Sequence, residues 1–134
     1  SLLDDELRQD LASIPEQRRL LVTCEGAFSY LANDYGLDEA YLWPVNAESE
    51  ITPKRMARLI ETVRKRGVPA VFCESTVSDK AQRQVAEATG ARFAGTFYVD
   101  SLSNSDGPAS TLLDLQRHNV KLIREGLASD GSHS

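Results

Sequence analysis

Two cysteines occur among the 134 residues of the sequence, and long apolar runs are absent. Two cysteines form at most one disulfide, so a disulfide-rich scaffold is excluded as the main source of stability. No stretch approaches the roughly 20 apolar residues that a membrane-spanning helix needs. The residues that follow Ser1 have neither the basic start nor the apolar run of a secretory signal, so we expect any targeting segment to have been removed or to lie outside the given sequence.

Basic residues are also scarce, with 15 Lys and Arg against 20 Asp and Glu, and the net charge is −5. Binding to nucleic acid needs clustered cations that neutralise phosphates, and the densest basic run, residues 64–66, comes at the end of an expected helix. We therefore expect no nucleic-acid partner. Hydrophobic residues make up 41% of the sequence, which is enough for one folded domain with a core.

Short apolar runs alternate with amphipathic stretches, a pattern typical of βα units around a parallel sheet. The best-defined helix begins after Thr52, a capping residue, and ends at Gly67. We predict an α/β fold, with a mostly parallel four-stranded sheet flanked by helices. The expected strands are residues 20–23, 40–43, 68–72 and a run within 92–99, and the expected helices are 3–14, 28–35, 53–66, 80–89 and 112–126.

Acidic residues follow three of the four predicted strands, at Glu25, Glu74 and Asp100. Ligands bind at the carboxyl ends of the strands in open parallel sheets, so three carboxylates there predict a cation site. Oxygen ligands suit Mg²⁺, Ca²⁺ and Mn²⁺. The alternative for each acid is capping of the next helix, which we favour for Glu74 because capping residues, Ser75 and Thr76, follow it.

The histidines and cysteines lack the spacing of a metal site. His118 lies inside the last predicted helix and His133 lies in the final residues, so we expect both to be surface or packing residues. Cys24 and Cys73 each precede one of the acids at a strand end. If their strands are neighbours, the two cysteines can form a disulfide; the alternative is a pair of buried thiols, and the residues leave both open.

Four separated segments, in order, resemble the carboxy-terminal lobe of the metal-binding solute receptors of ABC transporters. These are the manganese, iron and zinc receptors called cluster A-I or cluster 9 proteins. The resemblance extends over about residues 11–127. The segments are VTCEGAFSYLA at 22–32, YLWPVNAE at 41–48, FCEST at 72–76 and YVDSL at 98–102.

The resemblance implies a metal held between two lobes. In this chain it assigns two carboxylate ligands, Glu25 and Asp100, and it implies that Glu74 and Ser101 support the site without binding the metal. Glutamate at position 25, where zinc receptors have histidine, favours Mn²⁺ or Fe²⁺, with Zn²⁺ as a further candidate. Two carboxylates leave an octahedral ion incompletely coordinated, so we expect weak binding by this chain alone.

The resemblance also implies how the chain is organised. Residues 1–15 are expected to end the helix that joins the lobes, residues 16–127 to form the carboxy-terminal lobe, and residues 128–134 to be a disordered tail. The expected partners are an amino-terminal lobe that supplies two histidine ligands and an ABC permease in the membrane. The expected location is the periplasm, or the outer face of a membrane as an anchored lipoprotein.

The preferred class is therefore a binding protein and not an enzyme. Surface that the other lobe normally covers would be exposed here, so self-association is expected. The main alternative is a Mg²⁺-dependent phosphoryl-transfer or hydrolase domain that uses the same three acids. The sequence lacks the glycine-rich loops that cradle phosphate in such enzymes, which weighs against that alternative.

Overall fold

The structure is a computed structural model that describes residues 2–44, 51–98 and 112–128. Helices and strands alternate along most of this length, and the predicted α/β class is confirmed. None of the helices described there is both long and apolar enough to cross a bilayer. The elements are α1 (Leu2–Ala12), η1 (Glu16–Arg18), β1 (Leu20–Glu25), α2 (Ser29–Asp34), β2 (Asp38–Trp43), α3 (Pro53–Arg66), β3 (Ala70–Glu74), α4 (Lys80–Thr89), β4 (Arg92–Phe97), α5 (Leu112–Ile123) and η2 (Arg124–Ala128).

The boundaries of α3 follow from its terminal residues, as predicted. The side chain of Thr52 accepts a hydrogen bond from the amide of Arg55 at 3.1 Å, which satisfies one of the free donors of the first turn. Gly67 ends the helix in the left-handed conformation, with φ of 64°, which favours glycine. Strands β1 and β3 extend two residues further than the sequence predicts, through Glu25 and Glu74, so these acids belong to the strands themselves.

The four strands form two parallel hydrogen-bonded pairs. β1 pairs with β2 from Leu20 opposite Asp38 to Glu25 opposite Trp43, and β3 pairs with β4, where Glu74 lies opposite Phe97. The two pairs meet where β1 of one pair lies beside β3 of the other. There the Cα atoms of Cys24 and Cys73 are 4.9 Å apart. The carboxyl ends of all four strands therefore lie at one edge, which we call the rim.

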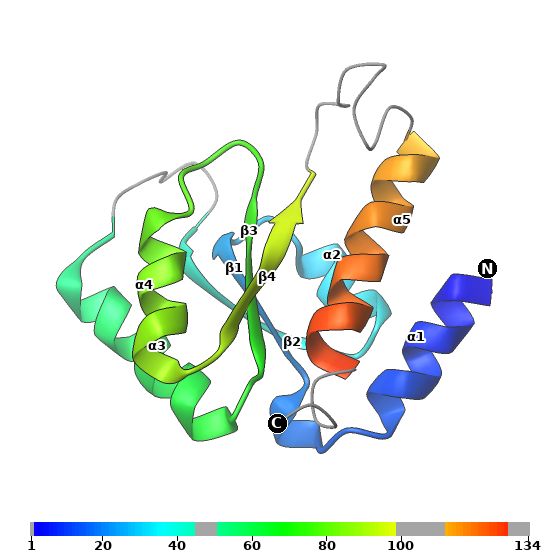
Figure 1. Cartoon of the computed structure of the whole chain (residues 1–134), viewed down its shortest axis with the longest axis horizontal. Helices are drawn as coiled ribbons and strands as arrows, with labels where there is room; N and C mark the ends of the chain where they lie inside the picture. Colours follow the sequence, from blue (N-terminus) through cyan, green and yellow to red (C-terminus); the bar gives the residue numbers. More distant parts are fainter. Residues whose placement is uncertain (1, 45–50, 99–111, 129–134) are drawn as a thin grey trace.

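Helices cover both faces of the strands. Figure 1 shows α3 and α4 on one side of the strands and α1 and α5 on the other. Phe72 and Phe97, both without exposed surface, stack with ring centroids 4.8 Å apart in the core. α1 is tied to η2 by Arg124, whose Nε donates to the Asp10 carboxylate at 2.8 Å. Ala128, which the sequence analysis assigned to the tail, is the last residue of η2, and residues 129–134 lie outside the described residues.

Candidate functional site

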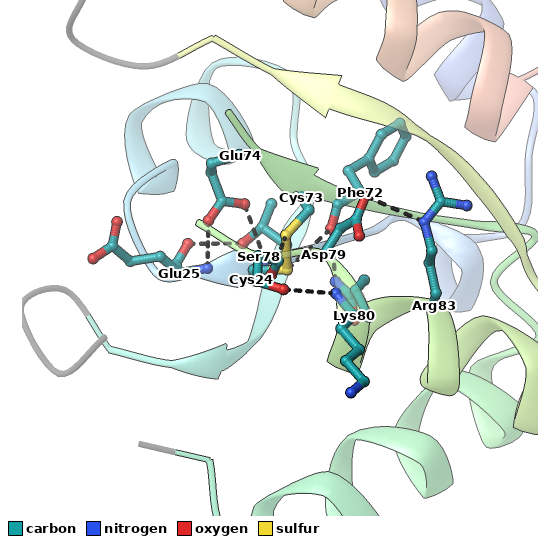
Figure 2. Close-up of a disulfide and its surroundings, with 11 residues drawn as sticks. Cys24, Glu25, Phe72, Cys73, Glu74, Ser78, Asp79, Lys80 and Arg83 are labelled. Atoms are coloured by element: carbon teal, nitrogen blue, oxygen red, sulfur yellow. Dashed lines mark hydrogen bonds and ion pairs between the residues drawn. A yellow bond between two sulfur atoms is a disulfide. The ribbon is translucent and has the colours of Figure 1, made fainter. Parts of the chain in front are cut away.

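The ends of β1 and β3 are joined covalently at the rim. The Sγ atoms of Cys24 and Cys73 form a disulfide with an S–S distance of 2.03 Å. The sequence leaves a disulfide and a pair of buried thiols as alternatives, and the structure has the bonded form (Figure 2). Both residues are fully buried, so the bond holds the last residues of the two strands together from inside the fold.

Glu74 joins the same two strand ends through hydrogen bonds. Its side chain is 1% exposed, and its two carboxylate oxygens accept hydrogen bonds from consecutive backbone amides of β1. Oε2 accepts from the amide of Cys24 at 3.0 Å, and Oε1 accepts from the amide of Glu25 at 2.6 Å (Figure 2).

The helix-capping role favoured for Glu74 is therefore wrong. At the start of α4 the amide of Lys80 donates to Ser78 Oγ at 3.2 Å. The Glu74 side chain reaches β1 instead, because Glu74 is the last residue of β3 and β1 lies beside it. The capping residues that follow Glu74 in the sequence suggested a local role, whereas its partners come from a strand about fifty positions earlier in the chain.

Burial raises the pKa of Glu74 from 4.5 to about 7. The two amide hydrogen bonds favour the ionised form and lower the pKa of Glu74, but they only partly offset the loss of hydration. The negative charges of Glu25 and Glu39 raise that pKa further. Glu25 and Glu39 therefore lie near enough to Glu74 to influence its ionisation, and an acidic environment of this kind favours a nearby cation.

Glu25 is the last residue of β1, and its backbone is held from several directions. Its carbonyl accepts hydrogen bonds from Thr23 Oγ1 at 2.9 Å and from the amide of Ala27 at 2.8 Å. The next residue, Gly26, donates to the carbonyl of Trp43 at 3.0 Å. Figure 2 shows the side chain of Glu25 extending away from the disulfide, so its carboxylate is directed away from the joined strand ends.

Glu39 on β2 was not singled out from the sequence. Its Oε1 atom accepts a hydrogen bond from Ser29 Oγ at 2.7 Å, and its Oε2 atom accepts from the amide of Phe28 at 3.3 Å. Phe28 directly precedes α2 and Ser29 is its first residue, so Glu39 joins the start of α2 to β2. In the sequence Glu39 is the second of two adjacent acids before the apolar run of β2, and this pattern does not identify its partners.

Cys24, Cys73 and Glu74 are a group of metal-ligand types whose ligating atoms lie within 4.8 Å of one another among the described residues. Metal ions bind the thiolate form of cysteine. Here both sulfurs are bonded to each other, so these cysteines have no thiolate to offer. The group therefore joins two strands and is not itself a metal site.

Asp100 and Ser101, the other predicted site residues, lie outside the described residues. The described range that contains β4 ends at Tyr98, one residue beyond that strand. Asn119 of α5 holds Tyr98 at both backbone groups, accepting from its amide at 3.0 Å and donating to its carbonyl at 2.9 Å. His118 of the same helix has Nε2 3.0 Å from the carbonyl oxygen of Thr96, so it packs against β4 as expected.

Residues 1–126 match the family model ZnuA, described as zinc-uptake complex component A, periplasmic. Among curated proteins the iron-binding protein YfeA of Yersinia pestis is 49% identical over 124 residues, which are 92% of this chain and 40% of that protein. The manganese ABC transporter substrate-binding lipoprotein PsaA of Streptococcus mitis is 34% identical over 94% of this chain and 41% of its own length.

Solved structures agree in fold. A manganese-bound periplasmic metal-binding protein from Candidatus Liberibacter asiaticus has a TM-score of 0.81 and 39% identity, over 92% of this chain and 46% of that one. The periplasmic zinc-binding protein TroA of Treponema pallidum has a TM-score of 0.80 and 28% identity, over 95% of this chain and 48% of that one.

The chain thus spans somewhat less than half the length of the relatives that it matches, which fits one lobe of such a receptor. It belongs to the ZnuA family of metal-binding components of ABC transporters.

Proposed function

We propose that this member of the ZnuA family is the carboxy-terminal lobe of a solute receptor that delivers Mn²⁺ or Fe²⁺ to an ABC importer. Zn²⁺ is a further candidate. In this role Glu25 and Asp100 supply two carboxylate ligands to the ion, which is the cargo of the receptor. Glu74 and Ser101 support these ligands. The amino-terminal lobe supplies two histidines, and an ABC permease in the membrane receives the ion.

The observation that carries this proposal is the position of Glu25 in a chain of this family. Glu25 ends a central strand at the rim, its backbone is held by the structure around it, and its side chain extends away from the disulfide (Figure 2). Glu74, whose carboxylate accepts from the Glu25 amide, adds a second acidic group beside it. Hard oxygen ligands in a negative environment suit Mn²⁺ and Fe²⁺ better than the softer ions.

The anchoring of Tyr98 supports a second ligand at Asp100. Asn119, which is 2% exposed, holds both backbone groups of Tyr98 just past the end of β4. β4 pairs in parallel with β3, and Phe97 lies opposite Glu74, so the chain leaves β4 at the rim. Asp100 follows Tyr98 by two residues in the sequence. That short distance along the chain favours a carboxylate close to Glu25.

Calorimetric titration of the chain with Mn²⁺ tests this proposal. We expect affinity weaker than micromolar, because two carboxylates leave most of the coordination shell to water. Substitution of Glu25→Gln together with Asp100→Asn is expected to remove the binding. Asp34→Asn together with Glu61→Gln is the matched control, because it removes two negative charges at exposed positions without touching a proposed ligand. Unchanged binding in the double variant would overturn the proposal.

The same role predicts binding and release of an ion with no covalent step, so we propose no enzymatic activity. A phosphatase assay with Mg²⁺ tests this, and turnover that depends on Glu25 would favour the phosphoryl-transfer alternative. A buried disulfide is typical of exported proteins, which supports a location in the periplasm or on the outer face of a membrane.

Self-association remains a proposal for the surface that another lobe would cover. Among the described residues, Tyr30 at the start of α2 is an exposed large hydrophobic side chain, with 58% of its surface accessible. Light scattering over a range of chain concentrations tests the proposal, and a monomer at every concentration would contradict it.

A further inference from the structure

The Glu74 carboxylate reaches from the end of β3 to the last two amides of β1. We propose that Glu74 is a positioning residue, which sets the direction of the Glu25 side chain by holding the backbone amides of Cys24 and Glu25. This inference rests on the proposed function, because it takes Glu25 as a ligand of the metal cargo. It adds the way in which Glu74 acts, namely through the backbone of the ligand residue and not through the metal.

A carboxylate is the side chain that this pair of partners requires. Both partners are N–H groups, which only donate, and they lie next to each other along β1. An ionised carboxylate offers an acceptor oxygen to each of them. A glutamine in the same place offers one oxygen and one NH₂ group, and the NH₂ group would face an amide that also donates. Glutamine therefore cannot satisfy both amides of β1, although its side chain has the same shape as that of glutamate.

The peptide group between Cys24 and Glu25 is where this contact affects the site. The disulfide holds the side chain of Cys24 on one side of that peptide group. On the other side, Gly26 lies beneath the ring of Tyr41, so closely that a Cβ atom on Gly26 would come within 2.8 Å of Cε2. The Glu25 amide lies between these fixed points and is held by Glu74 Oε1. Without that bond the peptide group can rotate and redirect the Glu25 side chain.

Glu39 provides a matched control in the same part of the molecule. It also carries one negative charge that influences Glu74, and it also accepts a hydrogen bond from a backbone amide. Its second partner, however, is the hydroxyl of Ser29, which can accept as well as donate. Above pH 7, where Glu74 is ionised, Glu39→Gln therefore removes the same charge as Glu74→Gln while leaving partners that a glutamine can satisfy. At such a pH the two variants separate the position of the backbone from the loss of one negative charge.

Hydrogen exchange of individual amides, followed by NMR in the metal-free chain, measures the backbone directly. In Glu74→Gln we expect the amides of Cys24 and Glu25 to exchange about tenfold faster or more, because a buried N–H has lost its acceptor. The amides of α3 should be unchanged. In Glu39→Gln, Cys24 and Glu25 should exchange as in the unsubstituted chain. Unchanged exchange at both residues in Glu74→Gln would overturn the proposal.

Titration with Mn²⁺ then tests whether the position of the Glu25 backbone affects the affinity for the metal. At a temperature where circular dichroism shows every variant folded, we expect Glu74→Gln to weaken binding about tenfold or more, and Glu39→Gln to weaken it much less. A purely structural role for Glu74 would lower the melting temperature and leave the affinity of the folded chain unchanged. Equal losses in the two variants would show an effect of charge alone. Either result would overturn the proposal.

The experiments also give a decision in two further cases: a chain that binds no Mn²⁺ and a Glu74→Gln variant that does not fold. If the unsubstituted chain binds no Mn²⁺, the proposed function fails for this chain, and the exchange measurement still decides whether Glu74 holds the Glu25 backbone. If Glu74→Gln does not fold, Glu74→Asp replaces it, because aspartate keeps both oxygens and draws them back by one methylene group. We expect faster exchange of at least one of the two amides in Glu74→Asp, and unchanged exchange would overturn the proposal.

Discussion

β1 has a neighbour on each side, and it is joined to them in different ways. A parallel backbone ladder joins it to β2, from Leu20 opposite Asp38 to Glu25 opposite Trp43. The Cys24–Cys73 disulfide and the Glu74 carboxylate join it to β3. A ladder distributes the connection over many backbone bonds that do not depend on residue type. The contact with β3 depends on particular side chains, so single substitutions there are expected to have larger effects.

The largest expected effect comes from loss of the disulfide. The bond closes a loop between residues 49 positions apart, and its constraint on the unfolded chain is worth about 4 kcal/mol in the chain-entropy model. Reduction, or Cys24→Ala together with Cys73→Ala, is expected to lower the free energy of unfolding by about this amount. Urea unfolding with and without a reductant measures it.

The double alanine variant is also the control for the reductant. A reductant should destabilise the unsubstituted chain and leave the variant unaffected, because the variant has no bond to break. A loss of less than about 1 kcal/mol on reduction would mean that the contact between β1 and β3 is maintained by packing and Glu74.

The next largest effect is a dependence of stability on pH that originates at Glu74. Burial raises the pKa of Glu74 from 4.5 to about 7 in the folded chain, so the folded state binds this proton more tightly than the unfolded state. The stabilisation that comes from this tighter proton binding at Glu74 is complete below about pH 4.5 and is lost as the pH rises to about 7. The loss approaches about 3 kcal/mol, at 1.36 kcal/mol for each pKa unit.

The comparison with Glu74→Gln isolates this contribution from other titrating groups. Urea unfolding of both proteins at several pH values gives the difference in their free energies of unfolding. That difference should change between about pH 4.5 and 7 and become constant above that range. A difference that is independent of pH would show that Glu74 keeps the same charge in the folded and unfolded chain.

The side of β1 that the ladder holds is also the side that the sequence predicts best. Residues 20–23 and 40–43 are continuous apolar runs, and the parallel pairing of such runs follows from the alternation of strands and helices. The helix boundaries at Thr52 and Gly67 were predicted for a similar reason, since each depends on a neighbouring residue type. Local chemistry determines these features, so a single sequence reveals them.

The side of β1 that faces β3 was predicted only in part. The positions of Cys24 and Cys73 at equivalent strand ends made a disulfide one of two alternatives, but the distance between the two strand ends, which decides between them, depends on the whole fold. The role of Glu74 was misassigned, because its hydrogen-bond partners come from a distant strand and the capping residues beside it are local. Contacts of this kind leave no periodic signal in one sequence.

A smaller effect is expected where β1 leaves the ladder, at Gly26. A Cβ atom there would lie 2.8 Å from Cε2 of Tyr41, so the ring must move. Because Tyr41 is half-buried, the ring has room to turn outward, and Gly26→Ala is expected to cost about 1 kcal/mol, near the lower limit for overpacking. Urea unfolding measures the loss, and Gly26→Ala combined with Tyr41→Ala should recover it relative to Tyr41→Ala alone.

The smallest effect is expected from Glu39→Gln, which tests whether the β2 side tolerates the change that the β3 side does not. Glutamine can accept from the amide of Phe28 and donate to Ser29 Oγ, so both partners of Glu39 stay satisfied. We expect a loss below about 0.5 kcal/mol, as for other partly exposed substitutions that leave no buried group unpaired. Unfolding in urea, side by side with Glu74→Gln at the same pH, measures both. Equal losses would mean that the two carboxylates act through their charge, and the contrast between the ladder and the side-chain contact would then not explain the stability of β1.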